Sequence, residues 1–212
     1  MSERYTPRGD FDPQGTNAKT IATYENRIQE YVEGTPHEVS NDFKEWMDTS
    51  LEGLPADALI LELGSGFGRD ARYIAGKGYQ IECTDATRGF VDMLGEQGFT
   101  AYELNALTDY IPGPNDLVLA NAVLLHFNPS ETAEVLRKVH DSLSDQGRFA
   151  FSLKQGDGEA WSDEKLGEPR YFCYWQRDEI EQLLRMSGYS NVEVTGDHSG
   201  SNALWLHIVA YK

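Results

Sequence analysis

The chain has 212 residues, of which 40% are hydrophobic and 11% aromatic, so it is long and apolar enough to bury a core rather than remain disordered. Its formal net charge of −17, from 35 acidic and 18 basic residues, is repelled by a phosphate backbone and argues against DNA or RNA as a partner. Because no apolar run approaches the roughly 20 residues that span a bilayer, and no secretion signal opens the chain, we expect a cytoplasmic protein without a membrane partner.

The segment before the first predicted strand divides into a tail and a helical region. Residues 1–16 contain dispersed Pro, Gly and Asp without an apolar period, so we expect a flexible tail. Residues 17–52 carry apolar and aromatic positions at helical spacing, among them Tyr24 and Tyr31. A glycine and a proline interrupt this pattern, which therefore predicts two helices.

From residue 58 onward, strand patterns alternate with helix patterns. Continuous apolar runs such as ALILEL are typical of strands that are buried on both faces. Helix signals include Asn128, Pro129 and Glu131, which together form a capping box. The predicted strands are 58–63, 79–84, 99–104, 116–123, 147–154, 190–195 and 203–211, and helices are expected at 69–78, 87–96, 128–143 and 176–187.

This alternation predicts an α/β fold with a Rossmann-like, doubly wound, mainly parallel seven-stranded sheet and helices on both faces. No internal repeat or linker divides residues 17–212, so we expect a single domain. Ligands of such sheets bind at the carboxyl ends of the strands. The loops after residues 63, 84, 104, 121 and 154 are therefore where we expect the site.

The strongest motif is a glycine-rich turn, Glu62-Leu63-Gly64-Ser65-Gly66-Phe67-Gly68, between a strand and a helix. Glycines allow positive φ angles and a close approach of the backbone to a ligand, and the helix that follows offers free N–H groups. Asp85 follows Glu62 by 23 residues (85 − 62) and ends the next predicted strand. A carboxylate there can accept both ribose hydroxyls of a nucleotide, although a tight turn and an ordinary helix cap explain the same residues.

A nicotinamide-dependent oxidoreductase is a competing interpretation of this motif. Its fingerprint requires a glycine or alanine three residues after the second glycine, where this chain has Arg69. Tyr73 and Lys77 have the spacing of a short-chain dehydrogenase pair, but they lie on the helix that leaves the glycine turn and cannot reach a nicotinamide. We therefore favour a different nucleotide and keep this enzyme class as an alternative.

On these residues the sequence resembles the class I S-adenosylmethionine-dependent methyltransferases over about residues 17–212. The first motif of that family, an acidic residue followed by G-x-G-x-G, is matched by Glu62, Gly64, Ser65, Gly66 and Gly68. The acidic residue that ends the second strand is matched by Asp85, which is implied to hold the ribose, and Ala86 is implied to lie along the adenine. The resemblance implies S-adenosyl-L-methionine as the cofactor and S-adenosyl-L-homocysteine as the product.

Two further motifs match less closely. Where the family often has an Asp that contacts the adenine amino group, this chain has Asn105 or Ala106, and an Asn oxygen still accepts a hydrogen bond. DLVLANAVLLHF resembles the motif of the fourth strand, which implies that Asn121 lies near the methionine end and that Leu125 and His126 lie beside the sulfonium.

The resemblance also divides the predicted domain. It implies an N-terminal helical lid in which Tyr24 covers the cofactor, although simple packing against the sheet is the structural alternative. The expected parts are the lid (17–52), a cofactor-binding core (58–154), a substrate loop (155–175) that closes over the acceptor, and a C-terminal helix with a strand pair (176–212).

Methyl transfer mainly requires alignment of the acceptor with an already activated methyl group, so few residues are dictated by the reaction. The candidates for the acceptor side are Lys154, Trp161, Arg170, Tyr171, Tyr174 and Trp175. The aromatic residues among them are explained equally well as a pocket wall or as packing at the edge of the sheet. His126 is the candidate general base, because its ordinary pKa lies near working pH, but a packing histidine bonded to the backbone is the favoured interpretation.

We therefore predict a methyltransferase that transfers a methyl group to an N or O atom of a small-molecule acceptor. The alternatives are a protein or peptide methyltransferase, a cofactor-binding module without catalysis, and the nicotinamide-dependent oxidoreductase. The two cysteines, Cys83 and Cys173, are too few for a disulfide framework or a zinc knuckle, so we expect no metal site and a reduced, buried Cys83. The sequence leaves the acceptor and the oligomeric state open.

Overall fold

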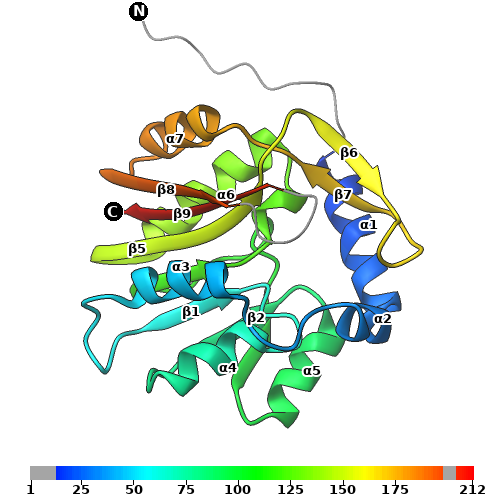
Figure 1. Ribbon diagram of the computed structural model, residues 1–212, viewed down its shortest axis with the longest axis horizontal. Coiled ribbons are helices and arrows are strands. Elements are labelled where there is room, and N and C mark those ends of the chain that lie inside the picture. Colours follow the sequence, from blue (N-terminus) through cyan, green and yellow to red (C-terminus); the bar gives the residue numbers. More distant parts are fainter. Residues whose placement is uncertain (1–12, 198–203) are drawn as a thin grey trace, which may run out of the picture.

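The computed structural model describes residues 13–197 and 204–212, and its centre is a seven-stranded sheet (Figure 1). The strand order is β3-β2-β1-β4-β5-β9-β8. Strands β1 to β5 run parallel, whereas β9 pairs antiparallel with both β5 and β8. The bounds are β1 (Ile60–Leu63), β2 (Glu82–Asp85), β3 (Thr100–Glu103), β4 (Asn115–Ala120), β5 (Leu143–Lys154), β8 (Asn191–Asp197) and β9 (Trp205–Tyr211).

Helices cover both faces of this sheet, which confirms the predicted Rossmann-like, mainly parallel architecture (Figure 1). The capping box at the start of α6 is formed as expected: the Asn128 side chain accepts from the backbone N–H of Glu131, and the Glu131 carboxylate accepts from that of Asn128. The helices are α1 (Pro13–Asn26), α2 (Ile28–Glu33), α3 (Asn41–Leu51), α4 (Arg69–Gly76), α5 (Arg88–Glu96), α6 (Pro129–Ser142) and α7 (Arg177–Met186), with a short 3-10 helix at Leu124–His126.

Each central strand supplies two hydrophobic cores, because successive side chains point to opposite faces of a sheet. In β4, Leu117 and Leu119 belong to the core that also contains side chains of α3, α4 and α5. Val118 and Ala120 belong to the core under α6 and α7. All four are fully buried, which explains why the strand reads as a continuous apolar run.

The N-terminal region differs from the prediction. Residues 1–12 of the expected tail lie outside the described residues, but α1 already begins at Pro13, before the predicted start of the helical region at residue 17. The buried face of α1 is made of polar residues, including Asn17, Thr20 and Thr23. The sequence of its first turns therefore has no apolar period from which a helix could be predicted. The region then forms three helices instead of two.

Residues 155–175 also differ from the expected polar loop. They contain two antiparallel strands, β6 (Glu159–Ser162) and β7 (Arg170–Cys173), drawn in yellow and orange at the right of Figure 1 beside α1. Tyr171 in β7 is 0% exposed and Trp175 is 2% exposed. The connection between these strands is polar and acidic, but the segment that follows it carries aromatic side chains that complete the core under α6 and α7.

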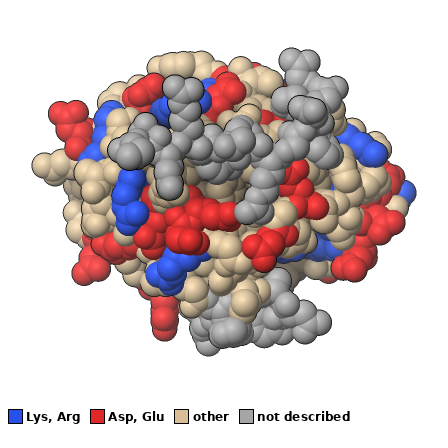
Figure 2. All heavy atoms as spheres, turned by 90° about the horizontal axis from the view of Figure 1, so that it is seen from above, with Lys and Arg blue, Asp and Glu red and all other residues tan. Residues whose placement is uncertain are grey.

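Charge on the surface is predominantly negative. On the face drawn in Figure 2, Asp and Glu side chains are spread widely and smaller areas of Lys and Arg lie between them. Within the part of the chain that the structure describes, no helix has the length and apolar character that a membrane crossing requires.

Candidate functional site

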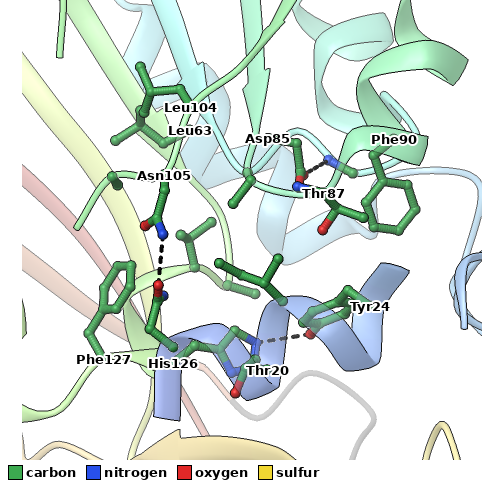
Figure 3. A pocket seen from close by; sticks show the side chains of 18 of the residues that line it. Thr20, Tyr24, Leu63, Asp85, Thr87, Phe90, Leu104, Asn105, His126 and Phe127 are labelled. Atoms are coloured by element: carbon green, nitrogen blue, oxygen red, sulfur yellow. Dashed lines mark hydrogen bonds between the residues drawn. The ribbon is translucent and has the colours of Figure 1, made fainter. Parts of the chain in front are cut away.

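A pocket lies at the carboxyl ends of β1, β2 and β4, and α1 forms its opposite wall (Figure 3). Eight of the predicted cofactor residues line it, as does His126; the eight are Tyr24, Gly64, Gly66, Asp85, Ala86, Asn105, Ala106 and Asn121. The predicted residues Glu62, Ser65, Gly68 and Leu125 do not line it. The structure therefore brings most of the expected binding residues together around one cavity.

The glycine turn and Asp85 hold each other in place. Gly64, Gly66 and Gly68 have φ angles of +67°, +54° and +82°, which only glycine adopts without strain. One carboxylate oxygen of Asp85 accepts from the backbone N–H of Gly66 at 2.9 Å, and the other accepts from that of Thr87 at 2.8 Å. The Thr87 side chain also bonds to this carboxylate, so three of its roughly four acceptor positions are used within the protein.

Burial raises the pKa of Asp85 to about 6, although the hydrogen bonds from Gly66 and Thr87 act in the opposite direction. Donor groups from a ligand would further favour the charged carboxylate. Asp85 thus places a buried hydrogen-bond acceptor at the wall of the pocket.

Glu62 lies beneath the glycine turn rather than in the pocket. Its side chain is 1% exposed, and its Oε2 atom has no hydrogen-bond partner among the described residues. Burial, together with the nearby carboxylate of Asp70, raises the pKa of Glu62 to about 8. Its position under the turn makes it a support for the binding loop.

The predicted site residue Asn121 is fixed by a buried polar network. Its amide nitrogen donates to Asp70 at 2.7 Å, and its oxygen accepts from the Ser152 hydroxyl at 2.6 Å. Arg69 donates to the other oxygen of Asp70 at 2.6 Å. Sequence reasoning missed Asp70, because an acidic residue in the first turn of a helix is an ordinary response to the helix dipole.

Tyr24 and His126 meet across the pocket through a defined hydrogen-bond chain. Nδ1 of His126 lies 2.6 Å from the backbone carbonyl oxygen of Tyr171, which can only accept, so Nδ1 carries the hydrogen. Nε2 is then an acceptor, and the Tyr24 hydroxyl donates to it at 2.9 Å (Figure 3). Arg170 donates to the Tyr24 oxygen at 3.2 Å. Burial lowers the pKa of His126 to about 3, which keeps the imidazole neutral.

The side chain of Asn105, which is expected to contact the adenine, is already hydrogen-bonded to other groups of the protein. Its amide nitrogen donates to the side-chain oxygen of Asn17 in α1 at 2.7 Å, and its oxygen accepts from the backbone N–H of Leu107 at 3.0 Å. Leu104 adds apolar surface beside Asn105, whereas Phe90 lies across the pocket, near Thr87 and Tyr24 (Figure 3). Asn17 therefore closes α1 onto the loop after β3.

The predicted acceptor residues do not line this pocket. Tyr171 is core rather than pocket wall, and Trp161 is 38% exposed, with Nζ of Lys19 4.7 Å from its ring centre. Tyr174 packs near Gly156, away from the lining residues. Arg170 contacts the lining through the Tyr24 hydroxyl, and the backbone of Tyr171 contacts it through Thr20 and His126. The Nζ of Lys154 lies 4.4 Å from the ring centre of Phe172.

Several lining residues had no clear signal in the sequence. Asn17, Thr20 and Ile21 come from the first turns of α1, which a polar buried face concealed. Phe90 fits the apolar stripe of its helix, and Tyr31 belongs to the helical region expected to form the lid. The rest of the lining is Leu63, Thr87, Leu104, Ala122, Val123 and Phe127.

Tyr73 and Lys77 lie outside the pocket. The Tyr73 hydroxyl donates to Asp48 at 2.8 Å, and Lys77 forms an ion pair with the same carboxylate at 2.7 Å. Their spacing therefore reflects a surface contact between α3 and α4.

Comparisons with known proteins find similarity in part of the sequence and in the fold. Residues 61–149 match the family model of a methyltransferase domain, and no curated protein matches the chain. Among solved structures, the Burkholderia thailandensis 1,6-didemethyltoxoflavin-N1-methyltransferase, with bound 1,6-didemethyltoxoflavin and S-adenosylhomocysteine, has 19% identity and a TM-score of 0.69 over 97% of this chain and 93% of that chain.

Two further structures have the same fold. The DhpI–SAM–HEP complex has 16% identity and a TM-score of 0.74, covering 95% of this chain and 99% of that chain. Phosphoethanolamine N-methyltransferase 2 of Haemonchus contortus, in complex with S-adenosyl-L-methionine, has 14% identity and a TM-score of 0.69 over 98% of this chain and 61% of that chain. Residues 61–149 of the present chain are thus similar to a methyltransferase domain, and the chain has the same fold as these S-adenosylmethionine-dependent methyltransferases.

Proposed function

We propose that the protein binds S-adenosyl-L-methionine in this pocket and transfers its methyl group to an N or O atom of a small-molecule acceptor. The observation that carries the proposal is the pairing of the glycine turn with Asp85, whose carboxylate binds the Gly66 N–H and borders the cavity. The neighbouring structures crystallised with S-adenosylmethionine or S-adenosylhomocysteine support the same cofactor.

A small acceptor is favoured over a protein or peptide side chain because α1 covers the pocket. Asn17 and Tyr24 of α1 are hydrogen-bonded to Asn105 and His126 on the opposite wall. A polypeptide would need these contacts to open, whereas a small molecule can be enclosed by them. The 1,6-didemethyltoxoflavin bound in the Burkholderia methyltransferase is a small molecule of this kind.

The cofactor supplies an activated methyl group, so the protein's part is to position the two reactants. Both nitrogens of His126 are engaged, which leaves no free lone pair for proton abstraction from an acceptor while the pocket is closed. The role that fits His126 is to orient the Tyr24 hydroxyl. The Tyr24 side chain in turn lines the cavity and would contact the acceptor.

Calorimetry with S-adenosyl-L-methionine, S-adenosyl-L-homocysteine and NAD tests the cofactor. A Cβ at Gly66 would lie 3.7 Å from Tyr31, without a clash, but would occupy pocket space, so Gly66→Ala should weaken binding of S-adenosyl-L-homocysteine. Gly53→Ala is the matched control, because Gly53 also has a positive φ, of +74°, and nothing within 4 Å of the added carbon. NAD binding, or equal affinity in Gly66→Ala, would contradict the assignment.

Turnover of S-adenosyl-L-methionine with a library of small nitrogen and oxygen nucleophiles then separates an enzyme from a binding module. Formation of S-adenosyl-L-homocysteine with at least one acceptor is the expected result. Binding of the cofactor without turnover of any acceptor would favour the non-catalytic alternative.

A further inference from the structure

Three basic side chains gather beside the pocket in a chain whose net charge is −17. Lys154 ends β5, and Lys165 and Arg170 belong to the β6–β7 hairpin. The Nζ of Lys154 and the Cζ of Arg170 lie 4.4 Å and 5.1 Å from the ring centre of Phe172, and the Nζ of Lys165 lies 4.4 Å from that of Tyr31. Aromatic rings therefore form the floor of this basic cluster, Lys154–Lys165–Arg170.

The cluster is not neutralised by the protein. Among the described residues, none of its three members forms an ion pair with a carboxylate. Arg170 is 6% exposed, and its Nε has no hydrogen-bond partner in the described part of the chain. Arg170 is the buried cation of the cluster, whereas Lys154 is half-buried and Lys165 is more exposed. A buried cation without a counter-charge is costly, so a ligand that supplied the charge would be bound favourably.

Burial and the neighbouring positive charges lower the pKa of both lysines in the cluster. Burial and the positive charges of Arg170, Arg69 and Lys154 lower the pKa of Lys165 to about 8. Burial and Arg170 also lower the pKa of Lys154, while Glu164 acts weakly in the opposite direction. Arg69 differs from the cluster because it is paired with Asp70.

The basic cluster lies in a different part of the sheet from the residues that are predicted to contact the nucleoside. Asp85 ends β2 and Asn105 follows β3, whereas Lys154 ends β5. In the strand order, β1 and β4 lie between these two groups. Arg170 reaches the pocket through the Tyr24 hydroxyl, and the His126 ring lies 4.9 Å from that of Phe172. The cluster therefore lies next to Tyr24 and His126, on the β5 side of the pocket.

We propose that Lys154, Lys165 and Arg170 bind an anionic group of the acceptor, a carboxylate or a phosphate or phosphonate. This names the substrate class and rests on the proposed function for its use in methyl transfer. Two flexible ammonium groups and one guanidinium suit an anion with several acceptor oxygens. The methylated atom would belong to another part of the same small molecule.

The test is an NMR-monitored titration of the protein, with and without saturating S-adenosyl-L-homocysteine, using inorganic phosphate and, separately, acetate. The Lys154→Gln/Lys165→Gln double variant should bind the preferred anion about tenfold more weakly or worse, because it loses two charged donors. Its affinity for S-adenosyl-L-homocysteine should be unchanged. Lys77→Gln removes the same charge at a distant ion pair and should match the wild type in both measurements.

The two anions distinguish between the possible anionic groups of the acceptor. Preference for phosphate indicates a phosphate or phosphonate group, and preference for acetate indicates a carboxylate. Absence of binding by both anions, or equal binding in the double variant, would overturn the proposal. Competition between the anion and S-adenosyl-L-homocysteine would also overturn it, since the cations would then hold the cofactor's own carboxylate. If S-adenosyl-L-homocysteine does not bind at all, the proposed function fails, while the titration without it still decides the anion site.

Discussion

The hydroxyl of Tyr24 donates to Nε2 of His126 at 2.9 Å, joining α1 to the turn after β4. Removing the hydroxyl in Tyr24→Phe leaves a buried acceptor without a partner, so we expect a loss of about 1–3 kcal/mol in the free energy of unfolding. Urea denaturation measures it. Tyr31→Phe removes a hydroxyl from the neighbouring ring, 5.3 Å away, and should have a smaller effect. Equal losses in both variants would argue against the bond.

The protonation of His126 gives a second prediction. Its pKa is lowered from 6.5 to about 3, so the unfolded chain binds the proton more readily over this range. The neutral His126 of the folded protein therefore contributes to the free energy of unfolding above pH 6.5, and this contribution is lost as the pH falls towards 3. Nitrogen NMR shifts of His126 should report a neutral ring with hydrogen on Nδ1 from pH 8 down to 5. A midpoint near 6.5 would restore His126 as a candidate base.

Asp85 supports both the ligand and the fold. Because its two oxygens accept from Gly66 and Thr87, Asp85→Ala should weaken binding of S-adenosyl-L-homocysteine and also lower the free energy of unfolding, each by about 1–3 kcal/mol. Calorimetry and denaturation measure the two effects separately. Asp92→Asn changes an exposed acid on α5 and should alter neither. Loss of affinity with unchanged stability would show that the loops hold their shape without the carboxylate.

Glu62 should make stability depend on pH in the opposite sense to His126. Its pKa is raised from 4.5 to about 8, so its contribution is greatest below pH 4.5 and declines as the pH rises to 8. Glu62→Gln removes the buried charge. The variant should gain stability relative to the wild type over this range, by at most about 1.4 kcal/mol per pH unit. Unfolding at pH 5 and pH 8.5, with Glu96→Gln as an exposed control, tests this; a constant difference would contradict it.

Trp161 and Tyr171 face each other across the β6–β7 hairpin with ring centres 5.7 Å apart, but their environments differ. Tyr171→Ala removes a fully buried ring and should cost about 3–5 kcal/mol of stability. Trp161→Ala affects a partly exposed ring and should cost much less. Thermal denaturation of the two single variants measures the contrast, and similar losses would show that the hairpin is held equally by both rings.

Much of the fold could be predicted because its signals are local. The apolar run Ile60–Leu63, the glycine turn that follows it and the capping box at Asn128 each depend on a few adjacent residues. Parallel strands bring their carboxyl ends together, so Gly66 and Asp85 were expected at one edge and lie there.

The rest depends on contacts that no local pattern encodes. Asn17 and Thr20 sit in α1 with a polar buried face, and their partners, Asn105 and Tyr171, are distant in the sequence. Tyr171 belongs to a strand concealed by a polar connection. Predictions based on apolar periodicity fail where polar side chains are buried against polar partners.

The attachment of α1 to the β6–β7 hairpin affects the order in which ligands bind and leave. The Thr20 hydroxyl oxygen accepts from the Tyr171 N–H at 3.1 Å, the Thr23 hydroxyl donates to the Pro169 carbonyl at 2.8 Å, and Arg27 donates to Glu168 at 2.8 Å. If α1 and the β6–β7 hairpin open together, an acceptor bound to the hairpin keeps both elements closed. The nucleoside part of the cofactor then cannot leave the pocket before the acceptor does. Product-inhibition kinetics should then show an ordered mechanism, in which the cofactor enters first and its product departs last.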